Sequence, residues 1–174
     1  MTMKVFNDNT VLSGPDINEY LVNTRYAVKP GNTTRTGTSL SDDPDLTFHI
    51  DASKSYLLDL FVILQGSDGG LKFALAGSGG NALYGLWQMQ LPLTAQGSTY
   101  GGSYDGGAVA NNLSTAQTVA SSLAFFGAVS ALTIRGILVT AGTSGSLTFR
   151  WCQNSGSGNL TVLAGSSMLL RRVS

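Results

Sequence analysis

The stretch Ser55–Gly66, SYLLDLFVILQG, decides the fold because it reads as one long β-strand with two apolar faces. Alternation with a period of two is the signature of a strand. One face carries five apolar side chains: Tyr56, Leu58, Leu60, Val62 and Leu64. The other face carries Leu57, Asp59, Phe61 and Ile63, and it is also mostly apolar. We therefore expect one face to pack on an opposite sheet and the other to be covered by an arm or a neighbouring subunit.

Similar alternation recurs along the rest of the chain. It is seen in DLTFHID (45–51), GGLKFALAG (69–77), SALTIRGILVTAG (130–142), GSLTFRWCQ (145–153) and NLTVLAGSSMLLRRV (159–173). Turns rich in Gly, Ser, Asn and Asp separate about eight such strands, a pattern typical of sandwiches and barrels. The prediction is an all-β protein: an antiparallel β-sandwich, a jelly-roll of about eight strands, that forms a single domain over residues 41–174.

Residues 1–40 differ from this pattern and are predicted to form an N-terminal arm. SGPDINEYLVNTRY (13–26) begins like a short helix, with Ser13 as a cap and Pro15 in the first turn. An extended polar chain follows. Such an arm has little core of its own, so it packs on its own barrel, packs on a neighbour, or stays mobile until it docks. The residues expected to contact neighbours are Ile17, Tyr20, Leu21, Arg25 and Tyr26.

Two further sets of residues are candidates for contact surfaces. Residues 94–118 read as a long Gly-rich loop that exposes Tyr100 and Tyr104, because long loops on rigid scaffolds often carry function. A plain flexible surface loop is the alternative. The candidates for a seam between subunits are Phe61, Ile63, Phe125 and Phe126.

The composition favours a protein that is covered by partners. Charged residues make up 11% of the 174 residues, against about 25% in typical soluble domains. The formal net charge is zero, which argues against nucleic-acid binding because a basic stripe is needed to replace counterions. No apolar run of about 20 residues predicts a membrane span. The first residues lack an apolar signal core, so export through a signal peptide is not expected.

The sequence offers few candidates for catalysis, and neither a cofactor nor a metal is expected. His49 is the only histidine, and it lies in the middle of an expected strand. Cys152 shares a strand face with Arg150, while Trp151 belongs to the core face with its neighbours at 147 and 149. Asp42, Asp43 and Asp45 could begin a calcium site, but Pro44 and the spacing favour a turn before a strand. The chain is therefore expected not to be an enzyme.

Several segments together resemble one known group of proteins. They are a helix start of the form D-x-N-x-Y-L at residues 16–21, DPDLTF at residues 43–48, and two C-terminal segments at residues 147–155 and 161–166. In this order they resemble small virion structural proteins of tailed bacteriophages and prophages. The resemblance covers most of the chain and is weakest at residues 94–118. These motifs are structural rather than catalytic, and the family pattern has Ala where Cys152 stands.

The resemblance implies a jelly-roll that assembles on a phage particle. Proteins of this kind commonly serve as capsid decoration, or cement, proteins, often as homotrimers that bind the major capsid protein across capsomer junctions. The expected location is thus the outer surface of the virion capsid, after synthesis in the host cytoplasm, with no nucleic-acid or membrane partner. A tail-fibre, baseplate or receptor-binding module is the alternative, and a glycan hydrolase is a third, more distant one.

Overall fold

A computed structural model describes residues 24–66, 70–77, 87–95, 98–104, 117–118, 129–154 and 158–173. For 87–95, 98–104 and 117–118 the description is limited to the strands and their pairing. These ranges contain strands and no helix, so none of them holds a helix that could cross a membrane. The predicted all-β class is confirmed.

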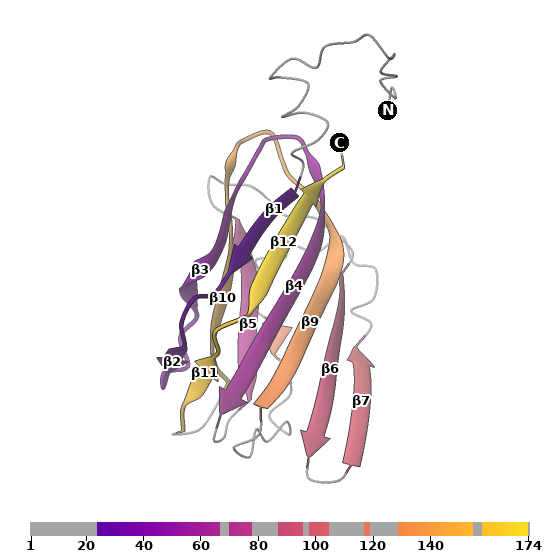
Figure 1. The fold of residues 1–174 in the computed structure, drawn as a ribbon. Coiled ribbons are helices and arrows are strands. Elements are labelled where there is room, and N and C mark those ends of the chain that lie inside the picture. Colours follow the sequence, from indigo (N-terminus) through magenta and orange to yellow (C-terminus); the bar gives the residue numbers. More distant parts are fainter. Residues whose placement is uncertain are drawn as a thin grey trace.

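Within these ranges, twelve strands form two antiparallel sheets that face each other (Figure 1). The strands are β1 (Thr24–Val28), β2 (Thr33–Arg35), β3 (Ser41–Ile50), β4 (Ser55–Gly66), β5 (Leu71–Gly77), β6 (Trp87–Ala95), β7 (Ser98–Tyr104), β8 (Gln117–Thr118), β9 (Val129–Val139), β10 (Gly145–Gln153), β11 (Leu160–Val162) and β12 (Ser167–Arg172). The larger sheet has the order β1-β12-β4-β9-β6-β7, with β11 bridging β4 and β2. The smaller sheet has the order β3-β10-β5-β8.

Eight of these strands follow the order of a jelly-roll. Taken along the chain they are β1, β3, β4, β5, β8, β9, β10 and β12. The larger sheet then contains the first, eighth, third and sixth as neighbours, and the smaller sheet contains the second, seventh, fourth and fifth. This interleaving is that of two Greek keys folded into a double sheet. The strands β2, β6, β7 and β11 are additions to that frame.

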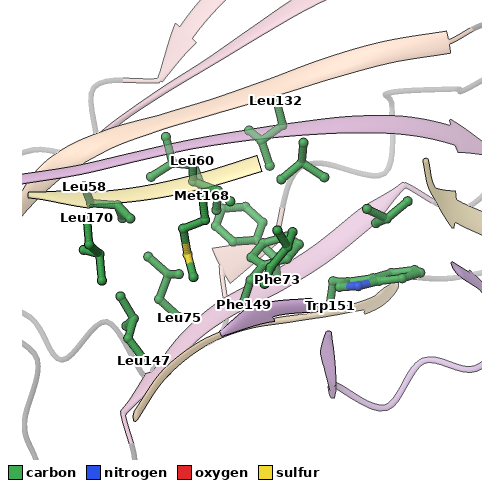
Figure 2. Packing of buried hydrophobic residues seen from close by; sticks show 14 of the residues in the cluster. Leu58, Leu60, Phe73, Leu75, Leu132, Leu147, Phe149, Trp151, Met168 and Leu170 are labelled. Carbon is green, nitrogen blue, oxygen red and sulfur yellow. The ribbon is translucent and has the colours of Figure 1, made fainter. Parts of the chain in front are cut away.

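The core lies between the two sheets (Figure 2). The inward residues of β4, from Tyr56 to Leu64, are all buried as the alternation predicts. They meet Leu147, Phe149 and Trp151 of β10, each with no exposed surface. Phe73 of β5 packs against Phe149 with ring centroids 6.1 Å apart. The predicted core face of the 145–153 strand is therefore confirmed.

From residue 24 onward, the segment expected to be an arm packs on its own domain. β1 pairs with β12 in the register Thr24↔Arg171 to Val28↔Ser167, and β2 pairs with β11. For residues 24–35, the structure thus agrees with the first of the three alternatives, in which the arm packs on its own barrel. The earlier part of the arm, including the expected helix with Ile17, Tyr20 and Leu21, lies outside the described residues.

The prediction of one long loop over residues 94–118 is wrong. The strand β6 extends to Ala95, and β7 pairs with it from Met89↔Tyr104 to Ala95↔Ser98. Tyr100 and Tyr104 therefore lie in a strand. Gly-rich sequence lowers strand propensity, but here an existing strand supplies the pairing partner. The short β8 at 117–118 adds a further pair with β5.

The prediction of a turn before the strand at residue 46 is also corrected. The strand β3 begins at Ser41, but its pairing with β10 shifts register between Thr148 and Arg150. The Asp43 side chain accepts hydrogen bonds from the backbone N–H groups of Asp45 and Leu46, at 3.1 and 3.2 Å. This Asp-turn chemistry occurs inside an irregular strand rather than ahead of it.

Candidate interaction surface

The outward face of the larger sheet is the most conspicuous functional candidate. We call it the apolar face and define it by the outward residues of β1, β12, β4 and β9 (Figure 1). Its large exposed hydrophobic side chains are Tyr26, Val28, Phe61, Val129, Ile137 and Val139. Partly buried Leu57, Ile63 and Leu169 lie among them. Large exposed apolar patches are uncommon on monomeric soluble proteins and mark contact sites.

Strand register places these side chains in rows across the sheet. Val28 pairs with Ser167, which pairs with Phe61. One row further, Tyr26 lies beside Leu169, and Leu169 lies beside Asp59. Neighbouring positions on paired strands hold side chains about 5 Å apart. The exposed apolar residues therefore lie in neighbouring rows of one sheet face, with polar positions such as Ser167 and Asp59 between them.

A charged pair interrupts this surface. Asp59 of β4 and Arg135 of β9 are cross-strand partners, and Arg135 Nε lies 3.2 Å from Asp59 Oδ2. The side chains of Arg135 and Asp59 are 69% and 44% exposed. An exposed pair of this kind adds little to stability. A partner that binds here must offer polar groups that match the Asp59–Arg135 pair. The pair therefore makes binding to this surface selective.

Some of the predicted seam and arm residues lie on the apolar face, and others do not. Phe61 lies on the apolar face with 39% exposure, and Ile63 lies on the same face but is partly buried. Tyr26, at 64% exposure, belongs to the face as well. Arg25 points to the other side of β1. Phe125 and Phe126 lie outside the described residues, and nothing is described of the side chains of Tyr100 and Tyr104.

Sequence reasoning identified Tyr26 of β1 as a contact residue, but it missed Val28 and the contribution of β9 to the apolar face. Val28 begins a segment whose polar composition predicts an extended arm. Ile137 and Val139 alternate with the buried Leu138. That alternation was the available signal, because it gives the strand two apolar faces like those of β4.

A polar cluster centred on Asp51 lies at one end of the sandwich, after β3. Arg25 donates to the His49 backbone carbonyl, and its other guanidinium nitrogen lies 3.2 Å from Asp51 Oδ2. Arg172 lies 3.8 Å from the same oxygen. The Tyr56 hydroxyl donates to Asp51 Oδ2 at 3.2 Å and accepts the Asp51 backbone N–H at 2.8 Å. The cluster ties the first and last strands to the β3–β4 turn.

The only histidine of the sequence, His49, lies beside the same cluster. His49 Nε2 lies 3.6 Å from Asp51 Oδ1, with the imidazole 64% exposed. Burial raises the pKa of Tyr56, and its protonated hydroxyl donates to the carboxylate. Asp51 is thus occupied by cationic and phenolic partners that position chain segments. In the part of the chain that is described, no group of three or more His, Cys, Asp and Glu side chains is arranged to hold a metal ion.

Cys152 is buried on the face of β10 opposite Trp151. Its thiol donates to the Thr38 carbonyl at 3.2 Å, so the segment between β2 and β3 covers it. Burial raises the pKa of the thiol, against a smaller lowering effect of Lys72 and Arg35. A reactive cysteine requires a stabilised thiolate and access. Cys152 has neither feature, and it serves as a small buried side chain.

The chain was compared with known proteins. No protein-family model matches it, and no curated protein matches it. Among solved structures it is similar to Eiger TNF from S. frugiperda, with 7% identity, 87% of this chain and 92% of that chain covered, and a TM-score of 0.41. It is also similar to a structure of infectious bursal disease virus, Gx strain, with 13% identity and a TM-score of 0.19. That match covers 87% of this chain and 37% of the viral chain. Both likenesses are weak, and the jelly-roll assignment rests on the strand order instead.

Proposed function

We propose that this chain is a non-enzymatic structural protein of a bacteriophage virion, a decoration protein that binds the outside of the capsid. The observation that carries the proposal is the apolar face, an outward sheet surface that exposes several large hydrophobic side chains. The low charge content supports the proposal. With 11% charged residues, a free subunit has little charge repulsion to prevent association with partners. The likeness of its segments to small phage virion proteins supplies the setting.

The apolar face is proposed as the seam between copies in a homotrimer. Burying apolar surface contributes about 25 cal/mol per Å², and stable interfaces bury about 1,200–2,000 Å² in total. Phe61 and Tyr26 are the largest exposed side chains on this face and are the proposed anchors. Aromatic side chains that become buried at an interface centre commonly dominate its binding energy.

The residues ahead of β1, with Ile17, Tyr20 and Leu21, are proposed to contact the major capsid protein. The physical mechanism is mass action. A subunit that binds only the assembled shell stabilises that shell relative to its separated parts. Many equivalent copies then act together against internal genome pressure. No enzymatic step is needed for this role.

The first experiment measures the number of copies per particle. Purified phage particles that contain this chain are analysed on a denaturing gel and by cryo-electron microscopy. The proposal expects a copy number comparable with that of the major capsid protein and density on the shell. A faint band, with density confined to the tail, would show a tail-fibre or baseplate protein and overturn the capsid assignment.

The second experiment tests the apolar face. We expect light scattering to give a trimer mass for the wild-type chain, and a monomer mass for Phe61→Asp. Thr36→Asp is the control, because Thr36 is an exposed residue between β2 and β3, outside the apolar face. A monomeric wild type, or a Phe61→Asp variant that remains trimeric, would remove the seam from the proposal.

A further inference from the structure

Lys29, immediately after β1, is a lysine with no exposed side-chain surface. Its Nζ lies 3.1 Å from Asp43 Oδ1 and 2.7 Å from Asp45 Oδ2. The Asp43 side chain is also fully buried, whereas that of Asp45 is 29% exposed. Lysine is rarely buried completely. The Lys29 amine is thus in contact with two carboxylates, of which Asp43 is buried and Asp45 is partly exposed to solvent.

The Lys29 backbone and the Asp43 carboxylate are both held in place. The Lys29 backbone N–H donates to the Ser166 carbonyl at 2.8 Å, and the Lys29 carbonyl accepts the Gly165 N–H at 3.0 Å. On the other side, Asp43 Oδ1 accepts two backbone N–H groups, and Asp43 Oδ2 accepts the Trp151 indole N–H at 2.9 Å. The Asp43 carboxylate is therefore fixed in position, and the buried Lys29 amine is held against it by its contacts with the two carboxylates.

From this geometry we propose that Lys29 and Asp43 condense into an intramolecular isopeptide bond. Lys29 Nζ attacks Asp43 Cγ, and a C–N bond forms while one C–O bond breaks. The two backbone N–H groups at Oδ1 are placed to stabilise the charge that develops on that oxygen, as in an oxyanion hole. Asp43 Oδ1 remains as the amide oxygen.

Asp45 is the catalytic base of this step. Its Oδ2 lies 2.7 Å from Nζ, within the reach required for proton transfer. An ammonium group and a carboxylate together lose one water, so the amine gives up two protons and the departing oxygen receives both. Asp45 takes the first proton from the ammonium group, and the nitrogen loses the second as the C–O bond breaks. Both protons end on Asp43 Oδ2, the oxygen at the Trp151 indole N–H, which departs as water. No oxidant or cofactor is required.

Burial and proximity favour the condensation. Two charges held in a protein interior carry a large desolvation cost, and an amide removes both charges at once. Fixed groups in contact react as if at very high concentration. The bond would close the segment between Lys29 and Asp43, fastening β1 and β2 to β3. This inference stands apart from the proposed function, since it concerns a site on a different part of the molecule.

Mass spectrometry of the full-length chain tests the proposal. The expected intact mass is lower by one water than that of the unmodified sequence. Trypsin does not cut between Lys29 and Pro30, so digestion would yield residues 26–35 joined to residues 36–54 through the new bond. Fragmentation of this pair should place the link at Lys29 and Asp43.

Two variants sharpen the test. Asp45→Asn, which removes the base, is expected to keep the full unmodified mass or to lose water far more slowly. Lys54→Arg, which alters a lysine elsewhere and keeps the tryptic site, should lose water like the wild type. A folded wild type with the full mass and separate 26–35 and 36–54 peptides would show a simple ion cluster and overturn the proposal. If Asp45→Asn does not fold, the wild-type and Lys54→Arg masses still decide it. Linkage in folded Asp45→Asn at the wild-type rate would refute the role of Asp45.

Discussion

Replacing Tyr56 by Phe isolates what the polar cluster contributes to stability. Tyr56 is 1% exposed and belongs to the core face of β4, so Phe keeps the ring in place and removes only the hydroxyl. Two hydrogen bonds disappear with it. One is donated to the Asp51 carboxylate at 3.2 Å, and the other is accepted from the Asp51 backbone N–H at 2.8 Å.

The expected cost follows from these two bonds. A hydrogen bond to a charged group contributes about 1.5–3 kcal/mol, and one between neutral groups about 0.5–1.5 kcal/mol. Arg25 and Arg172 remain to pair with the carboxylate, so the lower part of the summed range applies. We expect a loss of about 2–3 kcal/mol in the free energy of unfolding. At about 2–4 °C per kcal/mol for a chain of this size, the melting temperature falls by roughly 4–12 °C.

Urea denaturation at a fixed protomer concentration measures this loss, because association would otherwise change the apparent stability. Thr36→Val is the control. It removes a hydroxyl from an exposed residue between β2 and β3, away from the apolar face, and we expect it to alter the free energy by less than about 0.5 kcal/mol. A Tyr56→Phe variant as stable as the wild type, or a Thr36→Val variant that loses as much, would refute the assigned role.

Three other predictions follow from burial. Burial raises the pKa of Tyr56 in the folded protein, so the stabilising effect of its hydroxyl is complete below the unfolded pKa of about 10 and is lost as pH rises through the folded value. The free energy of unfolding should therefore fall more steeply with rising alkaline pH in the wild type than in Tyr56→Phe. Equal dependence on pH in the two proteins would contradict this. Cys152 should react with a thiol reagent slowly when folded and fast in denaturant, since its pKa is raised and it is buried; fast labelling of the folded chain would be the contrary result. Leu60→Ala should lower the free energy of unfolding by about 2–5 kcal/mol in the same urea assay. Thr133→Ala, on the outward side of β9, should lower it far less. Similar losses in the two variants would contradict the assignment of Leu60 to the core and Thr133 to the outward face.

The sequence predicted the parts of the fold in which burial controls the pattern. Each inward residue of β4 is buried, and its outward residues include exposed Phe61. Trp151 lies in the core as expected. These predictions are correct because a strand between a core and an open face must alternate. The same alternation also indicated that β4 would have a second apolar surface.

The parts that were missed are those whose structure depends on distant partners. Residues of β1 and β7 lack a strong pattern, and they become strands because β12 and β6 offer free edges. Asp43 looked like a turn residue because of its local chemistry. Its contacts with Lys29 and Trp151 come from segments 14 and 108 residues away in the chain, and no local pattern records them.

At the β1 edge of the larger sheet, contact through the apolar face is favoured over strand addition. β9 is no edge, because β6 and then β7 continue the larger sheet beyond it. The opposite edge is β1, which has only five residues and carries Arg25 tied to Asp51. Short strands with charged side chains are poor templates for pairing with another chain. Beside this edge, the outward surface of β12, β4 and β9 exposes Phe61 and Ile137 together with the Asp59–Arg135 pair, and another protein surface can bind there.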